Sequence, residues 1–462
     1  MPSRQDQLHS YQYSLQRVVA ALVTHDPDPS RSPLRRAGMT ALVSLLIASL
    51  AVLGATIYGI LTGHSNVDPK NAKVVFQEKG TGARFVFLES DGRLHPVLNY
   101  TSGLLLADSD TPELESIASD KLAAVDLGPT LGIPGAPDSL PAKGSLLTER
   151  WSVCTDNGGE ENTARSTLLI GDKLTDGTVA AKTGEALLIR DADHVWMVYN
   201  NRRHMIPDEH LTATLRVLRW ASRQPWPVAN AFENAIPVGN ELIAPAPPPD
   251  KGADSSVDGF KVGDIVTDSG QQFGMILADG MADITPMQAR LSQALPGADE
   301  PKTIGTKFAQ IPSSKTKLSD AGKPNALPFN VPKLHDGTPS RDCMTLPIEE
   351  DGLRIDPNFP SGVAATPGTG TPANVEIADF IHIARGKGVL AALSPSPDAP
   401  PDSSTVVLIT DTGRGFSLAN RSLITKLGYA GAKMPQIPSQ LVSMVPRGPA
   451  LDPAAARQTA AQ

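Results

Sequence analysis

The sequence predicts a mixed α/β protein with a single N-terminal transmembrane helix. An extracytoplasmic body follows, built from four strand-turn-strand-helix repeats in two related halves. Three observations lead to this prediction. One uncharged apolar run, residues 37–63, is long enough to cross a bilayer. Four later segments share one order of strand, turn, strand and helix, and the two cysteines, Cys154 and Cys343, follow the first and third of them at nearly the same interval.

The composition of the 462-residue chain excludes several classes of protein. The formal net charge of −8 argues against a nucleic-acid binder, which presents a basic surface. Two cysteines are too few for a disulfide-rich miniprotein or an all-cysteine zinc site. The 40% apolar fraction excludes wholesale disorder, and a single long apolar run excludes a polytopic membrane protein.

Residues 1–36 are predicted to hold an amphipathic helix on the cytoplasmic side. Ser3, followed by Asp6, is an N-cap signal. Apolar side chains then recur at helical spacing and form one stripe. Its members are Leu8, Tyr11, Leu15, Val18, Val19 and Leu22. Because the span begins soon afterwards, this stripe has to meet the bilayer surface or a partner protein. The near-zero charge of the helix favours the partner.

The run at 37–63 is predicted to be a retained transmembrane helix. At 1.5 Å per residue it gives a helix of about 40 Å, which spans about 30 Å of hydrocarbon with some tilt. A cleaved signal peptide is the alternative, but its apolar region is shorter and closer to the start of the chain. One face carries only small residues: Ala41, Ser44, Ala48, Ala51, Ala55 and Gly59. This face either packs against another span or reflects the general use of Ala and Gly in such segments.

The flanking charges predict that the N-terminus is cytoplasmic. Arg31, Arg35 and Arg36 precede the span, whereas Lys70 and Lys73 follow it beside an aspartate. Both cysteines lie after the span, and an even pair is typical of an oxidising compartment. The main body is therefore expected outside the plasma membrane.

Four segments of the outer part share one pattern. They cover residues 85–107, 195–218, 273–295 and 406–428. In each, a short apolar strand leads to a tight turn such as Asp91-Gly92 or Asn200-Asn201, then to a second strand and a helix start. Pro96, Pro207 and Pro286 are expected in the first turn of those helices. Four occurrences of one pattern indicate internal repeats.

The interval from Asp91 to Cys154 differs by one residue from that between Asp279 and Cys343. We interpret this as a duplication, with halves at 64–250 and 251–445 related by a pseudo-twofold axis and joined at a proline-rich linker. The two cysteines would then meet as equivalent residues, and a disulfide between them would stabilise the fold by about 5 kcal/mol. Two unrelated buried thiols remain the alternative. The tail at 446–462 is expected to fray after Pro453.

A search for catalytic constellations finds none that is convincing. Walker, H-E-x-x-H and G-x-S-x-G motifs are absent. Ser314-x-x-Lys317 and a Lys182-Thr-Gly string occur in the wrong order for a penicillin-binding protein. The acidic residues at 160–161 and 349–351 are expected to be solvated, and His204 and His210 to lie on the surface. No catalytic, metal or cofactor site is predicted.

Short strings along the chain match one protein family. Near the N-terminus they are Gln7, Tyr11, Tyr13, Arg17, Ala20-Ala-Leu22 and Pro33-Leu-Arg-Arg36. Farther on they are Ser90-Asp-Gly-Arg-Leu-His-Pro-Val-Leu-Asn99, Gly132-Ile-Pro-Gly-Ala-Pro137, Trp151-Ser-Val-Cys154, Tyr199-Asn-Asn-Arg-Arg203 and Pro446-Arg-Gly-Pro-Ala-Leu-Asp-Pro453. Through them the chain resembles EccB, the single-span core subunit of the type VII (ESX) secretion machine of actinobacteria.

The resemblance implies an elongated outer domain of repeats around a central β-core, bridged by one disulfide. It also implies a homo-oligomer within a membrane complex that contains the EccC motor ATPase, EccD, EccE and the mycosin protease. A structural and assembly role in protein export is therefore the favoured function. ATP hydrolysis has been attributed to some members, but no residues here are seen to carry it. A membrane-anchored hydrolase and a cell-wall tether are the alternatives.

Overall fold

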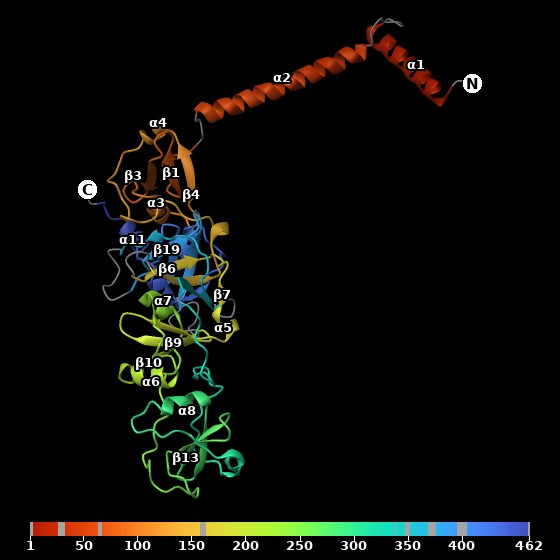
Figure 1. Ribbon diagram of the computed structural model, residues 1–462. Coiled ribbons are helices and arrows are strands. Elements are labelled where there is room, and N and C mark those ends of the chain that lie inside the picture. The colour runs from red at the N-terminus through yellow and green to blue at the C-terminus, as the bar shows by residue number, and fades with distance from the viewer. Residues whose placement is uncertain are drawn as a thin grey trace.

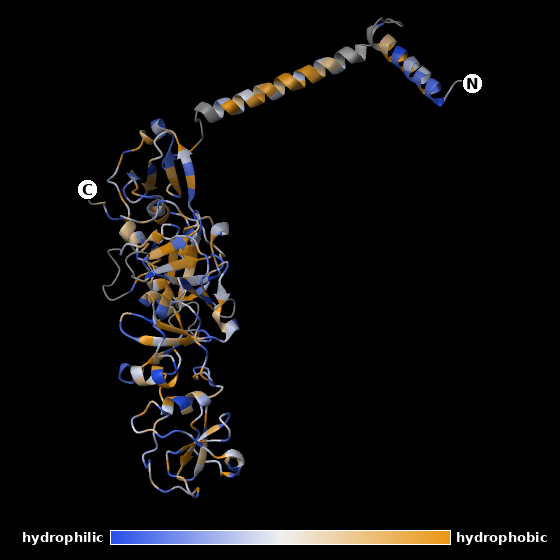
Figure 2. Ribbon diagram, viewed as in Figure 1, coloured by the Kyte–Doolittle hydropathy of each residue, from blue (hydrophilic) through white to orange (hydrophobic). Residues whose placement is uncertain are grey.

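The computed structural model describes residues 3–25, 33–62, 67–157, 163–337, 339–346, 352–367, 376–394 and 404–460. Two helices come first, α1 (Arg4–Thr24) and α2 (Pro33–Thr62). Ser3 and Asp6 form a capping box at the start of α1, as the N-cap signal predicts. Within α2, Gly38–Gly59 is long and apolar enough to cross a membrane. Figure 2 shows this stretch as largely hydrophobic, in contrast to α1.

Four sheets share one topology. In each, three successive antiparallel strands are followed by a helical segment and a fourth strand that pairs in parallel with the first. Repeat 1 contains β1 (Val74–Glu78), β2 (Arg84–Leu88), β3 (Arg93–Pro96), α3 (Tyr100–Leu106) and β4 (Glu113–Ile117), and α4 (Ser119–Leu122) follows. Repeat 2 contains β8 (Leu187–Arg190), β9 (Val195–Tyr199), β10 (Arg202–Ile206), η3 (Asp208–His210), α6 (Leu211–Val217) and β11 (Trp226–Pro227).

The other two repeats keep the same spatial order of third, second, first and fourth strand. Repeat 3 contains β12 (Ile265–Thr267), β13 (Phe273–Leu277), β14 (Gly280–Ile284), α8 (Pro286–Ser292) and β15 (Lys302–Thr303), and η4 (Gly305–Gln310) follows. Repeat 4 contains β20 (Gly388–Ser394), β21 (Val406–Thr410), β22 (Gly415–Ser417), α9 (Leu423–Lys426) and β23 (Gln436–Pro438).

The predicted strand-turn-strand-helix pattern is thus the middle of a larger unit. The hairpin turns form as expected: Asn200 and Asn201 both have positive φ, which is what a two-residue turn between twisted strands needs. Pro286 occupies the first turn of α8 as predicted. The prediction for Pro96 is wrong, because Pro96 ends β3 and pairs with Phe85, and Asn99 caps the next helix instead.

A seven-stranded sheet lies between the repeats, in the order β18-β19-β6-β5-β16-β17-β7. Its strands are β5 (Trp151–Asp156), β6 (Arg165–Ile170), β7 (Thr178–Val179), β16 (Arg341–Leu346), β17 (Leu353–Ile355), β18 (Val363–Ala364) and β19 (Phe380–Ile383). The remaining short helices are η1 (Lys143–Ser145), α5 (Ala180–Thr183), α7 (Asn230–Ala235), α10 (Ser439–Ser443) and α11 (Pro453–Ala456). Each half of the chain extends the side of the sheet that the other half forms: β19, with β18 outside it, joins β6, and β7 joins β17.

The order of the repeats along the body differs from their order in the sequence (Figure 1). One apolar cluster joins repeat 1 to repeat 4, for example through Leu104 and Leu408. A second cluster joins the central sheet to repeats 2 and 4. A third joins repeat 2 to Met287 and Leu291 of repeat 3. The body is therefore a row: repeat 1, repeat 4, central sheet, repeat 2, repeat 3. Each odd repeat packs on the even repeat of the other half.

The C-terminal tail is part of this packing, so the expectation that it frays is wrong. Leu451 and Ala456 are fully buried in the cluster between repeats 1 and 4. Thr459 forms an antiparallel bridge with Leu131, and the Ala460 N–H donates to the Thr130 carbonyl at 3.0 Å. Apolar contact with α3 holds the tail in place, which an alanine-rich composition does not reveal.

Candidate functional site

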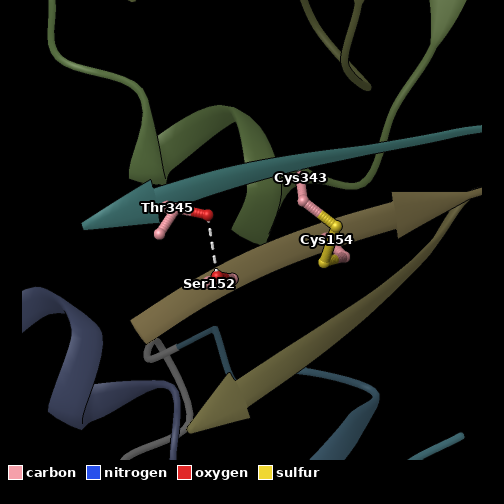
Figure 3. Close-up of a disulfide and its surroundings, with 4 residues drawn as sticks. All are labelled: Ser152, Cys154, Cys343 and Thr345. Atoms are coloured by element: carbon pink, nitrogen blue, oxygen red, sulfur yellow. Dashed lines mark hydrogen bonds between the residues drawn. A yellow bond between two sulfur atoms is a disulfide. The ribbon is translucent and has the colours of Figure 1, made fainter. Parts of the chain in front are cut away.

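The disulfide lies at the centre of the seven-stranded sheet. Cys154 in β5 pairs directly with Cys343 in the antiparallel strand β16, and both side chains are fully buried. On the same face the hydroxyls of Ser152 and Thr345 are hydrogen-bonded at 2.9 Å (Figure 3). The predicted disulfide is therefore confirmed, and its two cysteines are equivalent residues of the two halves. It joins positions 189 residues apart, and so ties the halves together at their junction.

The opposite face of β16 carries a carboxyl group that the sequence analysis missed. Asp342 is fully buried, and within the described residues neither of its carboxyl oxygens accepts a hydrogen bond of normal geometry; the Asp356 backbone N–H offers only a weak contact. Burial raises the pKa of this carboxyl well above its usual range, and the nearby Asp356 carboxylate raises it further. Next to it in the sheet, the Thr155 hydroxyl accepts a hydrogen bond from the Ala229 N–H at 3.1 Å. A signal for this buried acid was present in the sequence: Asp342 and Met344 are two residues apart, so in a strand the acid shares a face with an apolar side chain.

A second buried polar group connects repeat 2 to the central sheet. Arg203 of β10 forms an ion pair with Glu233 of α7, and both residues are buried. The guanidinium also lies 4.6 Å from the centroid of the Trp196 ring, whose N–H donates to Asp191 at 2.7 Å. A paired charge tolerates burial, whereas loss of one partner is costly. This cluster therefore fixes the orientation of repeat 2.

Three repeats share a ring stacked on a glycine. His95, His204 and Phe416 occupy the third strand, and their rings leave no room for a Cβ at Gly128, Gly239 and Gly448, respectively. Each glycine lies in a segment that pairs in parallel with the third strand and ends in a buried leucine three residues later: Leu131, Leu242 and Leu451. The recurring Gly-x-x-Leu string was the missed signal.

Because of this stacking, the expectation that His204 lies on the surface is wrong. The His204 ring is 1% exposed, and its Nδ1 lies 2.7 Å from the Asn240 carbonyl oxygen. Burial lowers the pKa of the imidazole. The ring is therefore a structural element of repeat 2.

The residues considered for catalysis do not assemble into a site. Ser314 is buried and donates a hydrogen bond to Asp279 at 2.5 Å, while Lys182 belongs to α5, after the central strand β6. The acidic residues at 160–161 and 349–351 lie outside the described residues. Across the described residues, no group of three or more His, Cys, Asp or Glu side chains is placed to hold a metal ion.

The predicted contact faces of the two N-terminal helices are exposed. On α1, Leu8, Tyr11, Leu15, Val18 and Leu22 have 48–75% of their surface exposed, and Val19 is partly buried. On α2, the small residues Ala41, Ser44, Ala48, Ala51 and Ala55 are exposed, while Gly59 is partly covered. Both faces are thus available for contact with other molecules.

Comparison with known proteins places the whole chain in one family. A family model described as type VII secretion system ESX-1, transport TM domain B, matches residues 1–461. The chain is 24% identical over 483 aligned positions to the ESX-1 secretion system ATPase EccB1 of Mycobacterium tuberculosis, covering 97% of this chain and 93% of that protein. It is 27% identical over 354 positions to the ESX-5 secretion system ATPase EccB5 of Mycobacterium marinum, covering 72% and 68% of the two chains.

Solved structures share the fold. A chain of an intact ESX-5 inner membrane complex superposes with a TM-score of 0.68 at 23% identity, covering 100% of this chain and 96% of that one. A chain of the EccB3 dimer from the ESX-3 core complex superposes with a TM-score of 0.63 at 21% identity, covering 83% and 100%. With a family model matched from end to end, an apolar N-terminal helix and a disulfide-bonded body of four repeats, the chain belongs to the EccB family of type VII secretion systems.

Proposed function

We propose that this protein is a structural and assembly subunit of an ESX inner-membrane complex, and that it braces the outer side of that complex. Membership of the EccB family, over residues 1–461, carries this proposal. The solved relatives, whose descriptions name an ESX-5 inner membrane complex and an EccB3 dimer, support it. In keeping with the dimer, the protein would be present in more than one copy.

The proposed topology places α1 in the cytoplasm, α2 in the plasma membrane and the repeats outside. The arginines before the span support this orientation. The buried disulfide supports it as well, since such bonds persist in oxidising compartments. Ser10→Cys and Ser90→Cys variants test the topology, because both positions are exposed. In intact spheroplasts a membrane-impermeant maleimide should label position 90 and spare position 10; the reverse pattern would overturn the orientation.

The two exposed helical faces are the proposed contacts with neighbouring subunits. The apolar stripe of α1 would bind a partner on the cytoplasmic side, and the small-residue face of α2 would let a second span approach closely. Following the family resemblance, the proposed neighbours are the EccC motor ATPase, EccD, EccE and the mycosin protease. A long row of repeats with two docking helices suits a subunit that holds others in position.

Gentle extraction followed by affinity purification tests this function. Leu15→Glu places a charge in the α1 stripe, and Ala51→Leu adds bulk to the α2 face. Each should reduce the recovered neighbours several-fold. Ser10→Glu and Ser49→Leu are the matched controls, since they make similar changes on other sides of the same helices and should leave recovery unchanged. A native protein that is extracted alone, without other subunits, would contradict the proposal.

ATP hydrolysis is a second candidate only because the relatives from M. tuberculosis and M. marinum bear the name ATPase. Phosphate release by the purified full-length protein in detergent tests it. We expect no release above that of a mock preparation from cells lacking the protein. Turnover that co-elutes with the protein and persists through a second purification step would favour the enzymatic alternative.

A further inference from the structure

The outer edge of repeat 1 differs from the same edge in the other three repeats. The fourth strand forms this edge in every repeat. In repeats 2, 3 and 4 it is short, two or three residues, and Pro227 or Pro438 lies within it or Pro301 directly before it. Short edge strands and proline discourage the addition of another strand. β4, by contrast, has five residues, Glu113–Ile117, none of which is proline, although Pro112 directly precedes it as Pro301 precedes β15.

Among the described residues, no backbone hydrogen bond is made by the outer side of β4. β4 is in parallel register with β1, and the Ile117 carbonyl accepts from the Lys79 N–H at 2.9 Å. Because residues that bond to a neighbouring strand alternate along a parallel ladder, Leu114 and Ser116 direct their N–H and C=O groups away from β1. Both residues are exposed, and Leu114 retains 42% of its surface. Figure 1 shows β4 at the margin of its sheet, at the end of the body nearest α2.

In each of the four repeats, the other edge of the sheet is closed by a later segment of the same chain. In repeat 1 the Leu94 N–H donates to the backbone carbonyl of Asp126 at 2.9 Å, and the Gly128 N–H donates to the backbone carbonyl of Leu94 at 2.9 Å. Repeat 4 shows the same pattern. The Gly415 N–H donates to the Pro446 carbonyl at 3.0 Å, and the Gly448 N–H donates to the Gly415 carbonyl at 2.8 Å. Such closure leaves the fourth strand as the open side of each repeat. Among the described residues, the fourth strand of repeat 1 is the longest of the four, with five residues against two or three.

The charge on β4 selects what can bind there. Glu113 and Glu115 alternate with Leu114, and Asp108 and Asp110 precede the strand; Lys121 is the first basic residue to follow. A second copy of β4 would place carboxylates opposite carboxylates, which destabilises a strand pair. A strand with Lys or Arg at every second position would instead pair its charges with Glu113 and Glu115.

We propose that β4 is a docking edge for an extended, basic segment of a partner protein, which adds to the repeat 1 sheet as a fifth strand. Backbone hydrogen bonds to Leu114 and Ser116 would supply affinity, and the two glutamates would supply specificity. The inference rests on the sheet edge and holds whichever subunits surround the protein.

The test uses the full-length protein in a non-ionic detergent and a fluorescent heptapeptide, Thr-Lys-Val-Lys-Val-Lys-Thr. The probe should bind at least tenfold more tightly than its acidic counterpart, Thr-Glu-Val-Glu-Val-Glu-Thr. N-methylation of every core amide should abolish binding, because it removes the backbone donors but keeps the charges. If the methylated probe bound as tightly as the unmethylated one, the contact would be non-specific electrostatic attraction, and the proposal would be overturned. Failure of the basic probe to bind would overturn it as well.

Variants of β4 locate the contact. Ser116→Pro removes the outward N–H and should weaken the basic probe at least tenfold, whereas Ser116→Ala keeps that N–H and should bind as the native protein does. Joint replacement Glu113→Lys and Glu115→Lys should exchange the preference, so that the acidic probe binds and the basic one does not. If that double variant keeps the native preference, the probe binds elsewhere and the proposal is wrong.

Discussion

Asp342 shows how much a single residue can oppose the fold. Burial of the Asp342 carboxyl favours its neutral form, because desolvation and the Asp356 charge raise its pKa by more than the Asp356 backbone N–H lowers it. Since the folded-state pKa lies above the unfolded value, the folded state binds the extra proton. The free energy of unfolding therefore decreases as pH rises from the unfolded pKa through the folded one.

Asp342→Asn removes this proton linkage at nearly constant volume. The variant should have a larger free energy of unfolding than the native protein at pH 7.5. This difference in free energy of unfolding should become smaller as the pH falls towards 4. Urea unfolding at several pH values checks this. Asp283→Asn, at an exposed position of β14, is the control and should show no such pH-dependent gap. A constant difference across the pH range would mean that Asp342 is already charged in the folded protein.

Gly239 shows the opposite case, in which a missing side chain is essential. A Cβ at this position would lie 2.3 Å from the His204 ring, so Gly239→Ala forces the ring or the segment to move. We expect a loss of about 1–3 kcal/mol, typical of an overpacked core. Gly144→Ala is the matched control, since no atom lies within 4 Å of the place that its methyl group would occupy. Thermal unfolding of both variants in the same detergent compares them.

At the scale of elements, the β5–β16 pair joins the two halves of the chain. Removing its covalent link with Cys154→Ala and Cys343→Ala should lower the free energy of unfolding by about 5 kcal/mol, since the disulfide closes a loop of 189 residues. Urea unfolding measures the loss. Because both cysteines are fully buried, reductant alone should not expose labelable thiols in the native protein. Rapid labelling without denaturant would show that this strand pair opens readily.

At the scale of the whole molecule, the C-terminal tail seals repeat 1 against repeat 4. Deletion of residues 451–462 removes the buried side chains of Leu451 and Ala456 from that cluster. By analogy with large-to-small core changes, the loss should be about 2–5 kcal/mol. Limited proteolysis should then release repeat 1 faster, while repeats 2 and 3 keep their resistance. A chain shortened by only its last two residues is the control and should behave as the native protein.

Several features could be predicted because they depend on local patterns. The apolar run of α2, the capping box of Ser3 and the Asn200-Asn201 turn each follow from a few neighbouring residues. The spacing of the cysteines indicated their pairing without any tertiary information. The short fourth strands escaped prediction, because a strand such as β11 has two residues and exists only through its partner.

Local patterns in the chain were enough to identify the apolar span, the hairpin at the centre of each repeat and the equivalence of Cys154 and Cys343. Periodicity and repetition are written into the chain and need no contact to be recognised. The packing of repeat 1 on repeat 4, the burial of His204 and Asp342, and the position of β4 at the edge of its sheet became visible in the folded protein. These features depend on contacts between residues far apart in the sequence, and such residues come together only when the chain folds.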